Sequence, residues 1–163
     1  MRYFVLLRFI NISNLVKKRK IAIASDHAGF YIKQILISFL AKEDIELKDL
    51  GCNSAADVDY PDFGHALARV VAEGECEFGI TICGTGNGMN MTVNKHPGIR
   101  SALCWNEEIS RLARAHNDAN ICSLPGRFIN DSEACLIVKT FLSTGFDGGR
   151  HLRRIKKISL KLY

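Results

Sequence analysis

Residues 79–88 read Gly-Ile-Thr-Ile-Cys-Gly-Thr-Gly-Asn-Gly, and this stretch decides the fold. Its first half is apolar and β-branched, which predicts a buried strand, and the three glycines that follow predict a tight turn. Glycine lets the backbone turn sharply and approach a ligand closely. A helix is expected next, and the unpaired N–H groups at its start can bind an anion.

Cys83 lies where this strand ends and the loop begins. N–H groups at a helix start lower the pKa of a nearby thiol, so we interpret Cys83 as a base or a nucleophile, with the loop stabilising the charge it generates. The six cysteines form no C-x-x-C pair and no zinc spacing, so free thiols are expected. Cys104 and Cys122 end or interrupt apolar runs and fit best as small buried hydrophobic residues.

The glycine loop has three other interpretations. A dinucleotide fingerprint needs G-x-G-x-x-G, but Met89 or Met91 stands at the third glycine position, although Glu107 has the spacing of a ribose-binding acid. A P-loop needs Gly-Lys-Ser/Thr, which is absent. A purely structural turn is possible, but three glycines in five residues are more than such a turn needs. Close approach to a ligand explains the excess.

Charge is distributed unevenly along the 163 residues. Residues 2–20 and 150–163 carry six Lys or Arg each and no acid, so residues 21–149 hold 22 − 12 = 10 basic against 17 acidic side chains. An acidic body argues against a nucleic-acid-binding domain. No apolar run approaches the roughly 20 residues that span a bilayer, so no membrane partner is expected either. Hydrophobic content of 47% is ordinary for one globular domain.

Residues 1–19 differ from the rest and are expected to be a poorly ordered N-terminal extension. Their apolar run is cut by Arg8, and no A-x-A cleavage site follows, so a secretory signal is not predicted and a cytoplasmic location is expected. The lack of acids would also suit a transit peptide or a surface anchor. Residues 20–163 are expected to form a single domain that includes a C-terminal helix over residues 150–163.

From residue 20 onward, short apolar runs alternate five times with helical periodicity. The alternation predicts an α/β fold, a three-layer α/β/α sandwich with a five-stranded parallel Rossmann-like sheet and an extra C-terminal helix. Strands are expected at residues 21–24, 45–50, 78–83, 99–104 and 119–124, with helices over residues 32–40, 62–71, 87–94, 107–116 and 131–142.

Ligands of parallel sheets bind beyond the carboxyl ends of the strands. Asp26 and His27 follow the first predicted strand, Cys83 ends the third, and Arg127 follows the fifth. Each histidine alone would more often be structural than catalytic. Together with Arg150 and Arg154, which begin the last helix after two glycines and could grip one phosphate, these residues predict a site for an anionic, polyhydroxylated ligand.

Six motifs between residues 20 and 158 closely resemble the type B ribose-5-phosphate isomerases, a family that also contains galactose-6-phosphate and allose-6-phosphate isomerases. They are Ser25-Asp26-His27-Ala28-Gly29, Asp59-Tyr60-Pro61, Cys83-Gly84-Thr85-Gly86-Asn87-Gly88, Asn94-Lys95, His116-Asn117-Asp118 and Gly149-Arg150-His151-x-x-Arg154.

The resemblance implies roles for these residues. Cys83 would be the base that moves a proton between C2 and C1 of the open-chain sugar; some members use a glutamate just beyond the loop, where this chain has Met89. His116, reaching in from a partner subunit, would open the ring. The implied catalytic residues are Cys83, His116, Thr85 and Asp26; the implied substrate-binding residues are His27, Tyr60, Gly84, Gly86, Asn87, Gly88, Asn117, Arg127, Arg150, His151 and Arg154. No metal and no cofactor are expected.

The activity implied is the reversible isomerisation of D-ribose 5-phosphate and D-ribulose 5-phosphate, in the non-oxidative pentose phosphate pathway, by a homodimer or homotetramer with active sites shared between subunits. A six-carbon phosphate isomerase of the same family is the nearest alternative, although galactose-6-phosphate isomerases divide the catalytic residues between two different chains. A non-catalytic sugar-phosphate or nucleotide sensor is an alternative of another class.

Overall fold

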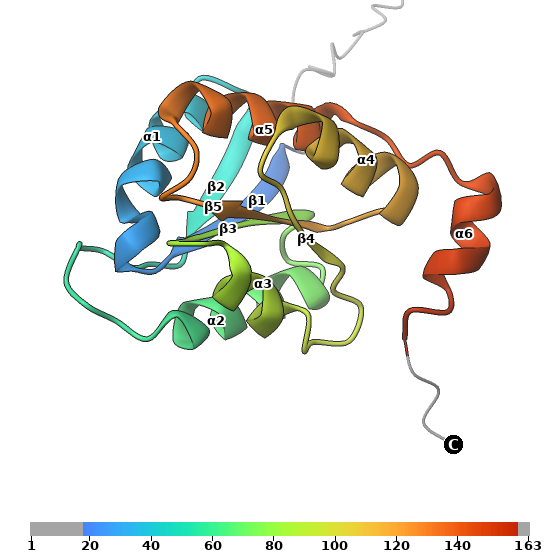
Figure 1. Cartoon of the computed structure of the whole chain (residues 1–163), viewed down its shortest axis with the longest axis horizontal. Helices are drawn as coiled ribbons and strands as arrows, with labels where there is room; N and C mark the ends of the chain where they lie inside the picture. Colours follow the sequence, from blue (N-terminus) through green and yellow to red (C-terminus); the bar gives the residue numbers. More distant parts are fainter. Residues whose placement is uncertain (1–17, 160–163) are drawn as a thin grey trace, which may run out of the picture.

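The structure is a computed structural model that describes residues 18–159 (Figure 1). One sheet holds five strands, β1 (Arg19–Ser25), β2 (Ile45–Asp49), β3 (Phe78–Cys83), β4 (Ser101–Leu103) and β5 (Ile121–Pro125). Their order is β2-β1-β3-β5-β4, and every pairing is parallel. The predicted α/β architecture with a five-stranded parallel sheet is confirmed.

Helices cover both faces of the sheet (Figure 1). One face carries α1 (Phe30–Leu40), α4 (Glu107–Asn117) and α5 (Asp131–Ser143), and the other carries α2 (Tyr60–Ala72) and α3 (Asn87–Val93). A short 3₁₀ turn, η2 (His27–Gly29), follows β1. The last helix, α6 (Gly149–Ile155), stands apart at one side of the molecule and packs against α4.

The sheet separates two apolar cores, and β1 contributes side chains to both of them. Ile21 and Ile23 pack into the core under α1 and α5, whereas Ala22 and Ala24 pack into the core under α2 and α3. Successive strand residues point to opposite faces, so this alternation fixes the register of β1.

Two predicted elements are shorter than expected. β4 covers Ser101–Leu103 rather than residues 99–104, because the N–H groups of Ile99 and Arg100 donate to His96 O and Asn120 Oδ1 instead of to the sheet. α6 ends at Ile155 rather than continuing to the end of the chain, and a turn follows. A short helix without many packed neighbours lacks the tertiary contacts that sustain longer ones.

Residues 1–17 of the predicted extension lie outside the described part of the chain, as do residues 160–163. Its last residue, Arg19, instead begins β1 and pairs with Ile45 of β2. Within residues 18–159, no helix combines the length and the apolar content needed to cross a bilayer.

Candidate active site

Three loops meet at the carboxyl edge of the sheet, held by backbone hydrogen bonds. The N–H of Asp26 donates to Ile82 O (3.1 Å), which ties the end of β1 to β3. The N–H groups of Gly126 and Arg127 donate to Cys83 O (2.9 Å) and Gly84 O (3.0 Å), which tie the loop after β5 to the glycine loop. β1 and β3 are neighbours although the chain passes through β2 between them, and such a switch point is where ligands bind in open parallel sheets.

A cavity of about 230 Å³ opens at this point. Ala28 lines it together with eight of the residues predicted for the site: Asp26, His27, Tyr60, Cys83, Gly84, Thr85, Gly88 and Arg127. Gly86 and Asn87 lie in the same loop without lining the cavity. The structure therefore gathers predicted residues from α2, from the end of β3 and from the segments that follow β1, β3 and β5 around one space.

The glycine loop is shaped for close approach. Gly86 caps α3 with a φ of 74°, a conformation that other residues rarely adopt. A Cβ added to Gly88 would lie 2.8 Å from the Tyr60 ring, so only glycine lets this ring pack on the loop. Cys83, 4% exposed, ends β3 beside these two residues and forms part of the cavity wall.

Asp26 and His27 are held in place by neighbouring groups. Asp26 Oδ1 accepts the N–H of Gly29 at 2.9 Å, which caps η2 and fixes the carboxylate. His27 Nδ1 accepts the N–H of Val58 at 3.4 Å and lies 3.1 Å from Asp57 Oδ1. The long loop between β2 and α2 therefore contacts one side of the cavity.

The other five predicted residues form a second group: His116, Asn117, Arg150, His151 and Arg154. They lie at the end of α4 and on α6, where the His116 and His151 rings stack with centroids 4.2 Å apart.

The two groups lie at opposite ends of β5. α4 ends just before β5 begins, whereas Cys83 pairs with Pro125, the last residue of that strand. Five strand residues span roughly 16 Å. In one chain, therefore, the second group lies away from the cavity that Cys83 lines.

His116, Asp147 and His151 place potential metal-binding atoms within 4.8 Å of one another. The two imidazole planes are parallel within 5°, so their nitrogen lone pairs, which lie in the ring planes, do not converge on one ion. Desolvation, the neighbouring His116 and the guanidinium groups of Arg150 and Arg154 lower the pKa of His151. This concentration of positive charge fits an anion better than a cation.

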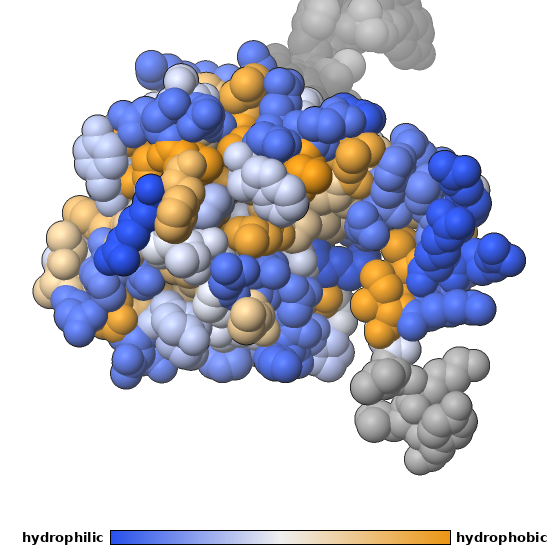
Figure 2. Space-filling view, in the orientation of Figure 1, coloured by the Kyte–Doolittle hydropathy of each residue, from blue (hydrophilic) through white to orange (hydrophobic). Residues whose placement is uncertain are grey.

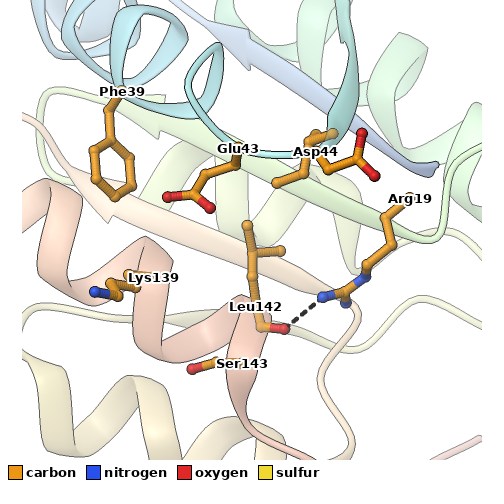
Figure 3. Close-up of a pocket in the computed structure, with 8 residues that line it drawn as sticks. Arg19, Phe39, Glu43, Asp44, Lys139, Leu142 and Ser143 are labelled. Atoms are coloured by element: carbon orange, nitrogen blue, oxygen red, sulfur yellow. Dashed lines mark hydrogen bonds between the residues drawn. The ribbon is translucent and has the colours of Figure 1, made fainter.

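A larger cavity of about 300 Å³ lies at the other edge of the sheet, between the ends of α1 and α5 (Figure 3). Arg19 reaches across it and donates to Leu142 O at 2.7 Å. Its lining holds no cysteine, no histidine and none of the predicted site residues. We therefore place the candidate site at the switch point.

Sequence reasoning missed two features near these groups. Ala28 lines the cavity, but a small apolar side chain carries no chemical signal. Asp118 belongs to the His116-Asn117-Asp118 motif, but the sequence does not predict that Arg100 and Arg114 both bind its carboxylate. Its place directly after His116 and Asn117 was the available clue.

Residues 21–158 match the model of the ribose/galactose isomerase family. The chain belongs to this family. Ribose-5-phosphate isomerase B of Escherichia coli, one of its relatives, is 37% identical over 141 residues, which are 86% of this chain and 95% of that one.

Solved structures of ribose 5-phosphate isomerases have the same fold as this chain. A ribose 5-phosphate isomerase of Thermotoga maritima has a TM-score of 0.85 and 51% identity, over 87% of this chain and 98% of that one. Ribose-5-phosphate isomerase B of Mycoplasma genitalium, solved with bound ribulose-5-phosphate, has a TM-score of 0.82 and 45% identity, over 85% of this chain and 93% of that one.

Proposed function

We propose that this chain interconverts D-ribose 5-phosphate and D-ribulose 5-phosphate, with Cys83 as the base. The observation that carries the proposal is the cavity in which Cys83, Asp26, Tyr60, Thr85 and Arg127 meet at the switch point. The names of the similar proteins point to the same reaction.

The reaction proceeds through an enediolate. The Cys83 thiolate removes the proton on C2 of the open-chain aldose, and the electron pair forms the C1–C2 double bond, leaving negative charge on O1. The hydroxyl proton passes from O2 to O1 beside Asp26 and Thr85, and Cys83 returns its proton to C1. Backbone N–H groups of residues 84–88 stabilise the charge, each contributing about 2.7–4 kcal/mol in the transition state.

Arg127 and His27 bind the phosphate in this scheme. The Arg127 side chain lies 3.4 Å from the position of a Cβ on Gly84, so it covers the base of the loop. Binding energy from the phosphate orients the reacting carbons at a distance from the chemistry.

A homodimer or homotetramer supplies the rest of the site. His116 of the partner subunit opens the sugar ring, and Asn117, Arg150, His151 and Arg154 enter with it, because α4 and α6 carry all five residues together. Figure 2 shows apolar side chains on α6 facing the body within a strongly polar surround. Leu152 of α6 and Ile158 just after it are exposed, and a second copy would cover them.

Steady-state assays of the full chain on ribose, allose and galactose phosphates test the proposal. We expect the highest kcat/KM on ribose 5-phosphate and loss of nearly all activity in Cys83→Ala. A higher kcat/KM on allose or galactose phosphate would instead indicate a six-carbon phosphate isomerase of the same family. Near-normal turnover by a folded Cys83→Ala variant would show that Cys83 is not the base. Binding of sugar phosphates without turnover would indicate a sensor.

A further inference from the structure

Asp118 ends α4 directly after His116 and Asn117, and its backbone is in the left-handed region, with φ 46° and ψ 44°. It is the one non-glycine residue with positive φ among residues 18–159. L-residues other than glycine, asparagine and aspartate enter this region at a cost of about 1–2 kcal/mol. The turn after His116 therefore depends on this residue.

Two arginines hold the Asp118 carboxylate from different elements. Arg100, just before β4, donates from Nη2 to Oδ2 at 2.7 Å, and Arg114 of α4 donates from Nη1 to Oδ1 at 2.8 Å. We name these three residues the Asp118 bracket.

Arg100 also closes the end of α4. Its Nε donates to the carbonyl oxygens of Asn117 (3.1 Å) and Asp118 (3.0 Å), and its Nη2 donates to Asp118 O at 2.7 Å. The last carbonyl groups of a helix have no partner within the helix, so these bonds fix the backbone on which His116 and Asn117 are mounted.

Arg114 is buried, and its guanidinium lies over the rings of Phe78 and Phe141, 4.7 and 5.8 Å from their centroids. Its Nη1 also donates to Ala119 O, at 2.6 Å. Its Nε is the one buried side-chain nitrogen or oxygen without a hydrogen-bond partner in the described part of the chain. Leaving such a group unpaired is costly, and the other contacts of the Arg114 guanidinium offset this cost.

We propose that Asp118, held by Arg100 and Arg114, is a positioning residue that sets the direction in which His116 and Asn117 enter the partner's cavity. This inference rests on the proposed function. The turn fixes the His116 backbone, and stacking on His151 fixes its ring. A misplacement of about 1 Å can lower a rate about 10²-fold, so a loosened turn affects turnover without unfolding the chain.

Two substitutions at Asp118 separate the effect of the left-handed turn from the effect of the carboxylate contacts with Arg100 and Arg114. Glycine is favoured in a left-handed residue at a helix end, so Asp118→Gly keeps the turn accessible while removing both carboxylate contacts. Asp118→Asn keeps the shape and one acceptor oxygen. Glu77→Ala is the matched control, because Glu77 binds the Arg19 guanidinium at 3.0 and 3.2 Å at the amino-terminal edge, outside both groups of site residues.

We expect Asp118→Gly to lower kcat on ribose 5-phosphate about 10²-fold, with a much smaller change in KM. Asp118→Asn should recover most of this loss, and Glu77→Ala should turn over like the parent chain. In a His116→Asn background, Asp118→Gly should lower kcat by a smaller factor than in the parent chain, because only one of the two positioned side chains, Asn117, remains.

Wild-type kcat in Asp118→Gly would overturn the inference, as would an equal further loss in the His116→Asn background. A loss in Asp118→Gly that Asp118→Asn does not recover would also overturn it. Absence of isomerase activity in the parent chain is a separate result, which removes the proposed function and this inference with it.

Discussion

Cys83 and Lys33 differ in how far each could be predicted from the sequence. The apolar run before Cys83 fixed its place at a strand end, and the parallel-sheet rule placed Asp26 and Arg127 at the same edge. Lys33 falls among the apolar residues of α1 and is completely buried, which helical periodicity does not explain. Its partner Asp49 comes from β2, and no local pattern joins the two.

The Lys33–Asp49 pair leads to a prediction about stability. Lys33 Nζ donates to both Asp49 oxygens, at 2.6 and 2.8 Å, and the Asp49 side chain is 36% exposed. Asp49→Ala leaves a buried ammonium unpaired and should cost about 3–5 kcal/mol of unfolding free energy. Lys33→Met should cost less, because water can solvate the remaining carboxylate. Urea titrations check the order, with Asp44→Ala of the exposed Lys18–Asp44 pair as a control that changes little; the reverse order would contradict the account.

The elements were predicted best where burial decides them. β3 matches its prediction residue for residue, because all six of its residues are buried. β4 does not, since a turn carbonyl, His96 O, and the Asn120 side chain, which is distant in sequence, accept the N–H groups of its first two predicted residues. The order β2-β1-β3-β5-β4 was not predicted, because strand pairing is a long-range property that periodicity within one segment does not encode.

A histidine pair joining α2 to the turn after α3 predicts a pH dependence. His65 Nδ1 and His96 Nε2 lie 2.8 Å apart, so one ring donates to the other. Desolvation and the charges of His65 and Arg69 lower the pKa of His96 from its ordinary 6.5. Between pH 6.5 and this lowered pKa, the unfolded chain therefore binds more protons than the folded chain. The free energy of unfolding decreases as the pH falls through this range, and the loss is complete below the lowered pKa.

Thermal unfolding of the parent chain and of His96→Gln checks this dependence. The parent chain should lose more stability than the variant between pH 7.5 and pH 5.5. His151, whose pKa is also lowered, contributes to the remaining slope in both proteins. Equal slopes would exclude the pair as a source of acid sensitivity.

At the scale of the whole molecule, the candidate site is divided between two ends of one sheet. The cavity with Cys83 lies at the carboxyl edge, and His116 lies where β5 begins. The sequence predicted both groups by resemblance. Their separation follows from the parallel sheet, because α4 ends immediately before β5 begins, whereas Cys83 pairs with the last residue of β5. We propose that two copies of the chain complete each active site.

Mixing two inactive variants tests this claim most directly. Cys83→Ala and His116→Ala should each be inactive on ribose 5-phosphate. After denaturation and joint refolding in equal amounts, half of the dimers are mixed and one of their two sites is intact, so about one quarter of the parent activity should return. If the mixture stays as inactive as its components, although tagged subunits show that mixed dimers have formed, the two groups do not act in one shared site and the account is wrong.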